Sequence, residues 1–187
     1  MIKQVMSVCC CVVVFSVPLF PETTSVGYKE FALGQTKEKI RKEIKGAYNK
    51  VSYSANGDMT IETGEMTITR LFFDQQEKLY LIQVEIKWGE IAKVKERLID
   101  KYGQPNDFRG EEFDRSTGSF LMAKWSIDKR YSISAWETED CRKSKVNPCV
   151  IYVEYLDINL KDAKIRFEQK KTEEAQKKKE GKTYDGF

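Results

Sequence analysis

The chain has no histidine among its 187 residues. This absence excludes the Ser-His and Cys-His pairs that activate most hydrolytic nucleophiles, and it removes a side chain that commonly binds transition metals. A P-loop, a dinucleotide-binding glycine pattern and an EF-hand calcium loop are also missing. We therefore predict no catalytic residue, no metal ligand and no cofactor, and we expect that the protein is not an enzyme.

Charge is scarce at the N-terminus. Lys3 is the only charged residue before Glu22, and the residues from Val5 to Phe20 are apolar apart from two serines and one proline. A basic start, an apolar core of about 15 residues and a polar exit are typical of a secretory signal peptide. We expect residues 1–25 to be this signal, cleaved after Ser25, and the remainder to be exported to the periplasm, the outer membrane or the extracellular space.

Two alternatives to cleavage remain open. An uncleaved membrane anchor would need about 20 apolar residues, but this core is shorter and Pro18 interrupts it. A lipoprotein would need a small residue before its acceptor cysteine, whereas Val8 precedes the run Cys9, Cys10 and Cys11. Both alternatives therefore fit the residues less well than a cleaved signal does.

Cysteine is almost absent from the expected mature chain, where only Cys141 and Cys149 remain. A structural zinc site needs about four ligands, and no CxxC redox motif occurs. Because exported proteins fold in an oxidising space, we expect these two residues to form a disulfide bond. In the chain-entropy account, closing so short a loop constrains the unfolded chain by roughly 2–3 kcal/mol.

Net charge is absent from the body of the chain. Residues 26–160 carry 22 basic and 22 acidic residues, whereas residues 161–187 carry nine basic and six acidic residues, which accounts for the overall charge of +3. A nucleic-acid groove needs clustered lysine and arginine, so we expect no nucleic-acid partner. The mixed charges of the tail leave peripheral membrane contact open.

Hydrophobic periodicity predicts two amphipathic helices, over about residues 36–47 and 89–105. Thr36 suits the N-cap of the first helix, and Gly103 suits the residue after the second. The apolar stripes consist of Ile40, Ile44 and Ala47 in the first helix and of Ile91, Val94, Leu98 and Tyr102 in the second.

Alternation of apolar and polar residues predicts strands. Residues 54–58 carry an Asn-Gly hairpin signal, and residues 26–35 lack a pattern, so we expect them to form an exposed lead-in. The strand-like runs are residues 66–73, 79–88, 119–127, 131–137 and 149–156, and one face of the second run carries Tyr80, Ile82, Val84, Ile86 and Trp88. One apolar and one polar face are typical of an antiparallel sheet covered on one side. We predict an α+β fold in which two amphipathic helices pack on an antiparallel sheet.

We expect a single domain over residues 26–160. The order helix, strands, helix, strands suggests a tandem helix-plus-hairpin repeat over residues 31–88 and 89–157, although a chance similarity within one α+β meander is the alternative. The tail, residues 161–187, is rich in charge and has no a/d seam for a coiled coil. We expect it to form an exposed helix that frays at Gly181 and is disordered beyond it.

Two acidic clusters are the remaining candidates for chemistry. They consist of Glu111, Glu112 and Asp114 in a predicted loop, and of Glu137, Glu139 and Asp140 at a predicted strand end. Either cluster could bind Ca²⁺ weakly or supply the carboxylate pair of a glycosidase-like hydrolase. Acidic loops of secreted proteins are mostly solvated, and we therefore assign neither role.

The segment LGQTKEKIRKEI, residues 33–44, resembles the opening of the BamE/SmpA-OmlA modules and of the related tandem folds typified by β-lactamase inhibitor protein. Gly34, Thr36, Glu38 and Ile40 match the Gly-x-Thr-x-Glu-x-aliphatic pattern of those modules. The segment LIDKYGQP, residues 98–105, resembles a helix ending of exported bacterial proteins of this type.

This resemblance covers residues 31–157 and implies helices packed on a small antiparallel sheet. It also implies a non-enzymatic role in protein binding or envelope assembly. The chain departs from the pattern because it lacks the usual lipid-anchored cysteine and because its first predicted helix ends without Gly-x-Pro.

Three functions therefore remain open. The favoured one is an exported, non-enzymatic module that binds another envelope or extracellular protein or serves as an envelope-structural component. The alternatives are a secreted carboxylate-dependent hydrolase and a surface adhesion protein that uses the basic tail. The oligomeric state is not predicted by these features.

Overall fold

The computed structural model describes residues 25–48, 50–64, 66–88, 90–107, 113–114, 119–138 and 149–184. These residues form an α+β fold with an antiparallel sheet, as predicted. The strands are β1 (Gly27–Tyr28), β2 (Phe31–Ala32), β3 (Val51–Tyr53), β4 (Met59–Gly64), β5 (Thr67–Phe73), β6 (Leu79–Lys87), β7 (Phe113–Asp114), β8 (Ser119–Ile127), β9 (Tyr131–Thr138) and β10 (Val150–Asp157). The helices are α1 (Lys37–Ile44), α2 (Ile91–Tyr102) and α4 (Ile158–Tyr184).

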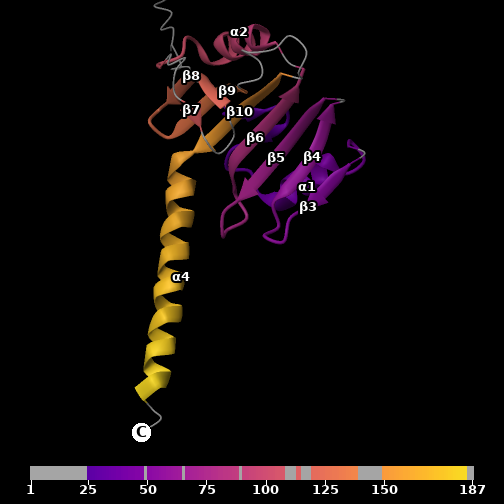
Figure 1. The fold of residues 1–187 in the computed structure, drawn as a ribbon. Coiled ribbons are helices and arrows are strands. Elements are labelled where there is room, and N and C mark those ends of the chain that lie inside the picture. Colours follow the sequence, from indigo (N-terminus) through magenta and orange to yellow (C-terminus); the bar gives the residue numbers. More distant parts are fainter. Residues whose placement is uncertain are drawn as a thin grey trace, which may run out of the picture.

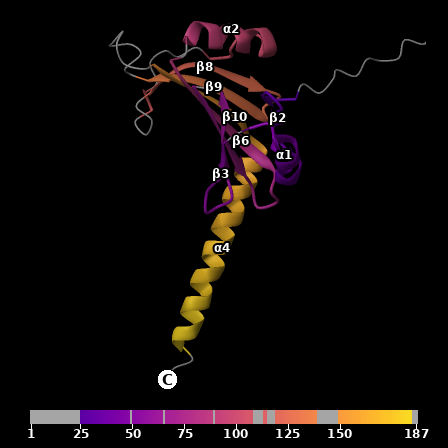
Figure 2. The ribbon, with the colours of Figure 1, turned by 90° about the vertical axis from the view of Figure 1, so that its right-hand side faces the viewer.

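Within the described residues, the main sheet has eight strands in the order β3-β4-β5-β6-β10-β9-β8-β7, and β1 and β2 form a separate hairpin. All neighbouring strands are antiparallel. Figures 1 and 2 show that the sheet is strongly twisted, with β8 and β9 rotated far from the direction of β3. The last strand, β10, lies in the middle of the sheet because it inserts between β6 and β9.

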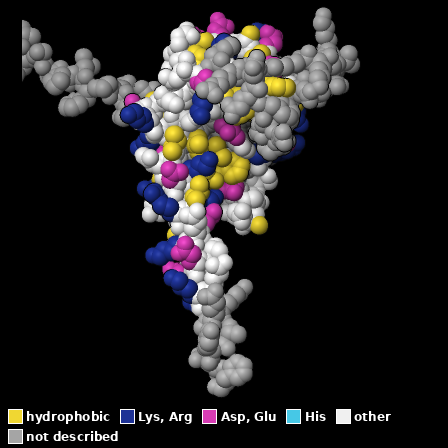
Figure 3. Space-filling view, turned by 60° about the vertical axis from the view of Figure 1, so that its left-hand side comes forward, with side chains coloured by type: hydrophobic (Ala, Val, Ile, Leu, Met, Phe, Trp, Pro, Cys, Tyr) yellow, Lys and Arg dark blue, Asp and Glu magenta, His cyan; other side chains and the backbone are white. Residues whose placement is uncertain are grey.

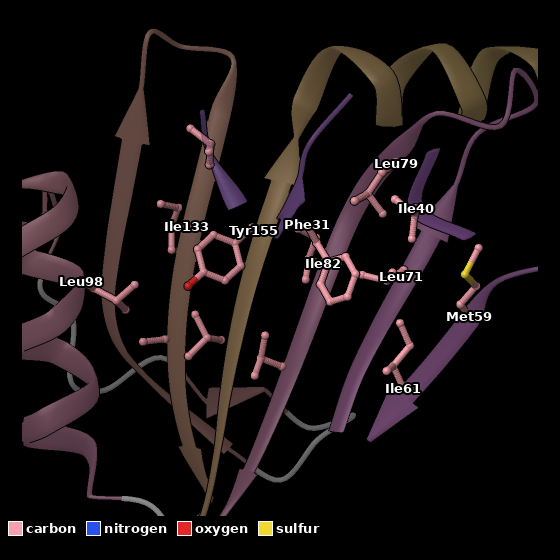
Figure 4. Packing of buried hydrophobic residues seen from close by; sticks show 14 of the residues in the cluster. Phe31, Ile40, Met59, Ile61, Leu71, Leu79, Ile82, Leu98, Ile133 and Tyr155 are labelled. Carbon is pink, nitrogen blue, oxygen red and sulfur yellow. The ribbon is translucent and has the colours of Figure 1, made fainter. Parts of the chain in front are cut away.

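The core lies between one face of the sheet and the two shorter helices. Cross-strand rows fill it, and one row runs through Met59, Leu71, Ile82, Tyr155, Ile133 and Trp125 from β4 to β8. The buried residues of α1 and α2 belong to the same cluster. Figure 4 shows Leu98 reaching from α2 toward the strands that carry Ile133 and Tyr155. One continuous core therefore spans both halves of the sheet.

Local signals explain where the two shorter helices begin and end. The Thr36 side chain accepts a hydrogen bond from the Lys39 backbone N–H at 3.4 Å, as an N-cap does. Gly103 follows α2 with φ +78°, and its N–H donates to the Ile99 carbonyl at 2.8 Å. Glycine suits that position because it lacks a Cβ that would clash at positive φ.

The prediction that residues 26–35 form an exposed lead-in is wrong. Phe31 is fully buried and Val26 is nearly so, and the β1–β2 hairpin adds both side chains to the core. Two-residue strands are too short to show an alternating pattern, so this burial depends on the tertiary fold. The Tyr102 hydroxyl at the end of α2 donates to the Gly27 carbonyl at 2.9 Å and helps to hold the hairpin.

Two further expectations need correction. Trp88 does not continue the apolar face of β6, because its φ of +60° ends the strand and leaves the side chain 59% exposed. The tail is not disordered directly beyond Gly181, since α4 runs on to Tyr184. An interior glycine costs about 1 kcal/mol relative to alanine, which is too little by itself to end a helix.

Candidate binding surface

The face of the sheet turned away from α1 and α2 is here called the outer face. Residues of β10 alternate between half-buried and buried, which is the pattern of a sheet with one open side. The apolar members of the outer face are nevertheless large: they are Ile68, Phe72, Leu81, Trp136, Tyr152 and Leu156. These side chains are partly exposed, whereas Leu121, which lies beside Trp136 on the same face, is 2% exposed.

The polar side chains of the outer face are paired with one another. Arg70 donates to Glu85 at 2.8 Å between β5 and β6, and Gln83 donates to Glu154 at 2.6 Å between β6 and β10. Burial raises the pKa of the neighbouring Tyr152, because it disfavours the phenolate, and Glu85 raises it further. The middle of the face is therefore a fixed arrangement of satisfied polar groups.

A groove of about 420 Å³ lies where α4 leaves the sheet, and it is here called the α4 groove. Its apolar lining comes from Leu81, Leu156 and Ile165, and its polar lining from Tyr80, Glu154, Lys161, Lys164 and Glu168. Figure 3 shows hydrophobic side chains gathered above the start of α4, with basic and acidic side chains among them. The volume is within the range of ligand-sized clefts.

The start of α4 is fixed by Asp157, whose side chain is fully buried. One carboxylate oxygen accepts from the Arg130 Nε and Nη2 groups at 3.0 and 2.8 Å, and the other accepts from the Leu160 N–H at 3.1 Å. The Ile158 N–H donates to the Arg130 carbonyl at 2.9 Å. A single carboxylate therefore caps α4 and ties it to the β8–β9 turn.

Lys164 forms a second attachment, in the second turn of α4. Its Nζ donates to the Tyr80 hydroxyl at 3.3 Å and to the Phe73 carbonyl at 3.4 Å, and it lies 4.8 Å from the centre of the Tyr80 ring. Beyond this contact the helix extends away from the body (Figures 1 and 2). The two attachments set the angle between α4 and the outer face, and so they determine the width of the α4 groove.

The predicted disulfide is only partly within the described residues. Cys149 is disulfide-bonded and packs against the core, and its carbonyl accepts from the Trp88 N–H at 2.7 Å. Cys141 lies outside the described residues, so its pairing with Cys149 stays a prediction.

The two acidic clusters also lie largely outside the described residues. Only Glu137 has a described side chain, and it is buried on the helix-covered face, opposite Ile151 of β10. Among the described residues, no group of three or more histidine, cysteine, aspartate or glutamate side chains could hold a metal ion. The structure therefore brings no two of these six carboxylates together within the described ranges.

The outer face and the α4 attachments were not identified by sequence patterns. Asp157 does precede a helix, where aspartate is a common cap, but nothing in the sequence links it to Arg130. Lys164 belongs to a run of charged residues, and such a run predicts a solvated surface rather than a contact. No helix in the described ranges is long and apolar enough to cross a membrane. The chain matches no protein-family model, no curated protein and no solved structure.

Proposed function

We propose that this protein is an exported, non-enzymatic module that binds another envelope or extracellular protein, or serves as an envelope-structural component, through its outer face and the α4 groove. The observation that carries the proposal is the set of large apolar and aromatic side chains on an open sheet face. A solvated sheet face is usually polar. Tryptophan, tyrosine and arginine are the residues that dominate binding energy at protein interfaces, and this face holds Trp136, Tyr152 and Arg70.

The paired charges of the outer face also favour a protein partner. Arg70 already forms an ion pair with Glu85, so a protein partner that covers this pair would leave neither charge unpaired, and Glu154 accepts a hydrogen bond from the neutral Gln83 amide. The apolar side chains around these pairs supply the area that can be desolvated. This combination suits a standard interface, which buries roughly 800 Å² on each partner.

Two structural refinements belong to this proposal. The chain offers a helix followed by four strands twice, α1 with β3–β6 and α2 with β7–β10, and β6 and β10 lie side by side. This order supports a tandem repeat with each helix as an amphipathic cover. In such a repeat β6 would correspond to β10. The predicted disulfide and the predicted signal peptide would both suit export.

Surface adhesion through the tail is a second candidate. Within the described side chains of α4, none of the charged residues beyond Lys164 forms an ion pair, whereas α1 pairs Lys42 with Glu38 at 2.7 Å. Unpaired lysines on a projecting helix are available to an anionic surface. Deleting residues 169–187 should then abolish binding to vesicles of phosphatidylglycerol at low salt. Unchanged vesicle binding would remove this candidate.

The hydrolase alternative needs two carboxylates about 5 to 9.5 Å apart across a substrate cleft. Glu137, the one member of the acidic clusters whose side chain is described, faces the core instead. If the protein is not a hydrolase, the double variant Glu137→Gln, Asp140→Asn should hydrolyse glycan substrates no more slowly than the unchanged protein does. Loss of a measurable activity in that double variant would establish the hydrolase.

Site-specific photo-crosslinking in intact cells tests the favoured function. A photoreactive phenylalanine analogue replaces Tyr152 or Leu156 on the outer face, and Lys42 on the exposed side of α1 serves as the matched control. We expect one and the same protein adduct from both outer-face positions and none from position 42. The double variant Tyr152→Ala, Trp136→Ala should weaken the adduct formed from position 156 without unfolding the protein. Equal adducts from all three positions, or none, would contradict the proposal.

A further inference from the structure

The strand β3 is an edge of the main sheet, and no residue that the structure describes bonds to its outward backbone groups. The Glu62 N–H donates to the Lys50 carbonyl at 3.1 Å, and the Ser54 N–H donates to the Asp58 carbonyl at 3.0 Å. Antiparallel pairs alternate between bonded and non-bonded positions, so the N–H and C=O groups of Val51 and Tyr53 point away from β4. No backbone hydrogen bond reaches those groups from any described residue.

An unpaired cation lies beside this edge on the helix-covered side of the sheet. The Arg41 guanidinium of α1 is 5.4 Å from the centre of the Tyr53 ring, and Tyr53 is 52% exposed. Arg41 makes no ion pair with any residue that the structure describes. A carboxylate placed next to Tyr53 on an added strand would meet this guanidinium, which is a favourable geometry for a charge-assisted hydrogen bond.

The other side of the same edge is hollowed. A depression of about 470 Å³ is lined by Lys50, Val51, Ser52, Thr60, Glu62 and Ile68. Lys50 and Glu62 form an ion pair at 3.1 Å across its rim, so the remaining lining is small, polar or aliphatic and carries no unpaired charge. An added strand would point one side chain into this depression, because successive side chains of a strand alternate between faces.

We propose that the β3 edge binds an extended acidic segment of a protein partner, added antiparallel to β3. Three consecutive residues of that segment are specified. The first is an aspartate or glutamate opposite Tyr53, in reach of Arg41. The second is an aliphatic residue opposite Ser52, in the depression above Ile68. The third is an apolar residue opposite Val51.

Main-chain bonding fixes this register. The partner residues opposite Tyr53 and Val51 each exchange two N–H···O=C bonds with β3, which gives four in total. Strand addition of this kind draws affinity from the main chain and specificity from alternate side chains. The depression shares Ile68 with the outer face, but the β3 backbone groups and Arg41 lie outside that face, so this inference does not rest on the proposed function.

A second copy of this chain fits the edge less well. Pairing two β3 strands about Ser52 would form the same four bonds, but it would bring two Arg41 guanidinium groups to one short strand pair and supply neither with a carboxylate. Like charges in such proximity are destabilising. Only three residues of each copy would pair. So short a contact buries far less than the roughly 800 Å² per partner of a stable dimer. An acidic segment therefore satisfies the site where self-pairing does not.

The test uses the full mature chain and two synthetic peptides, acetyl-Thr-Glu-Val-Val-Thr-amide and the same peptide with lysine in place of glutamate. Nuclear magnetic resonance follows the Val51 and Tyr53 amide signals during titration. We expect the glutamate peptide to shift and protect both amides. Arg41→Glu should weaken its binding about fivefold, as reversal of an exposed pair does, and should restore binding of the lysine peptide. Lys42→Glu, on the next residue of α1, is the matched control and should change neither affinity.

A second variant tests the backbone bonds. Val51→Pro removes the outward N–H while leaving the N–H groups that bond to β4, and it should weaken the glutamate peptide about fivefold, the effect of one lost hydrogen bond. Should that variant not fold, the charge exchange at Arg41 still decides the question. Peptide binding unchanged by Arg41→Glu, shifts confined to the outer face, or a stable dimer of the free chain with protected Val51 and Tyr53 amides would each overturn the proposal.

Discussion

Replacing Asp157 by alanine should destabilise the whole domain and loosen α4. The buried carboxylate accepts two hydrogen bonds from Arg130 and one from the Leu160 N–H. Loss of an N-cap costs about 1 kcal/mol, and a hydrogen bond to a charged group contributes about 1.5 to 3 kcal/mol. The Arg130 side chain is 46% exposed and can turn to water, which reduces the second cost. The free energy of unfolding should therefore fall by about 3 kcal/mol.

Circular dichroism at 222 nm and limited proteolysis are the assays for this variant. A loss of about 3 kcal/mol corresponds to a fall of roughly 6 to 12 °C in Tm for a domain of this size. The tail should also be cleaved faster, because α4 has lost its cap and one of its two attachments. Glu90→Ala is the matched control, since Glu90 stands at the N-cap of α2 without a side-chain cap bond, and its Tm should change little. An Asp157→Ala protein with an unchanged Tm and an intact tail would refute the role given to the carboxylate.

Three further predictions concern processing, the cysteines and pH. The intact mass of exported protein should correspond to a chain that begins at Val26 without acyl groups, and a mass that retains residues 1–20 would contradict the signal peptide. A thiol assay on exported protein should report no free thiol, and two reactive thiols would contradict the disulfide. Reduction should lower Tm without unfolding the domain, since closing the loop between Cys141 and Cys149 contributes roughly 2–3 kcal/mol to stability. Stability should fall as the pH rises above the ordinary tyrosine pKa of 10.0, because burial raises the pKa of Tyr155 in the folded state and the unfolded chain ionises first. Absorbance at 295 nm during an alkaline titration should show delayed ionisation, and a free energy of unfolding that is constant through pH 11 would contradict the raised pKa.

Short-range signals predicted the elements of this fold well. Thr36 caps α1 and Gly103 ends α2, because both effects depend on residues a few positions apart. The strand-like runs in the sequence predicted β5, β6, β8, β9 and β10, whereas β7 lies in a segment that was predicted to be a loop. These patterns are local consequences of helix and strand geometry, so a sequence can display them directly.

Features that depend on distant contacts were not predictable in this way. Phe31 is buried only because the β1–β2 hairpin meets a core made elsewhere, and β10 lies beside β6 only because the chain returns to the middle of the sheet. The Arg130–Asp157 pair joins residues 27 positions apart, and the Lys164–Tyr80 contact joins residues 84 positions apart. The outer face and the α4 groove depend on these pairings, and for that reason the candidate site became visible only in the structure.

Accessibility of the outer face inside cells tests the proposed binding function most directly. Ser134 lies on this face beside Glu154 of β10, and a Ser134→Cys variant reports solvent access through its rate of maleimide labelling. Lys42→Cys reports access at the exposed side of α1. We expect Ser134→Cys to react at least tenfold more slowly in intact cells than as purified protein, because a bound partner would cover about 90% of the molecules. Lys42→Cys should react at the same rate in both settings. Equal labelling of Ser134→Cys in the two settings would contradict a partner on the outer face.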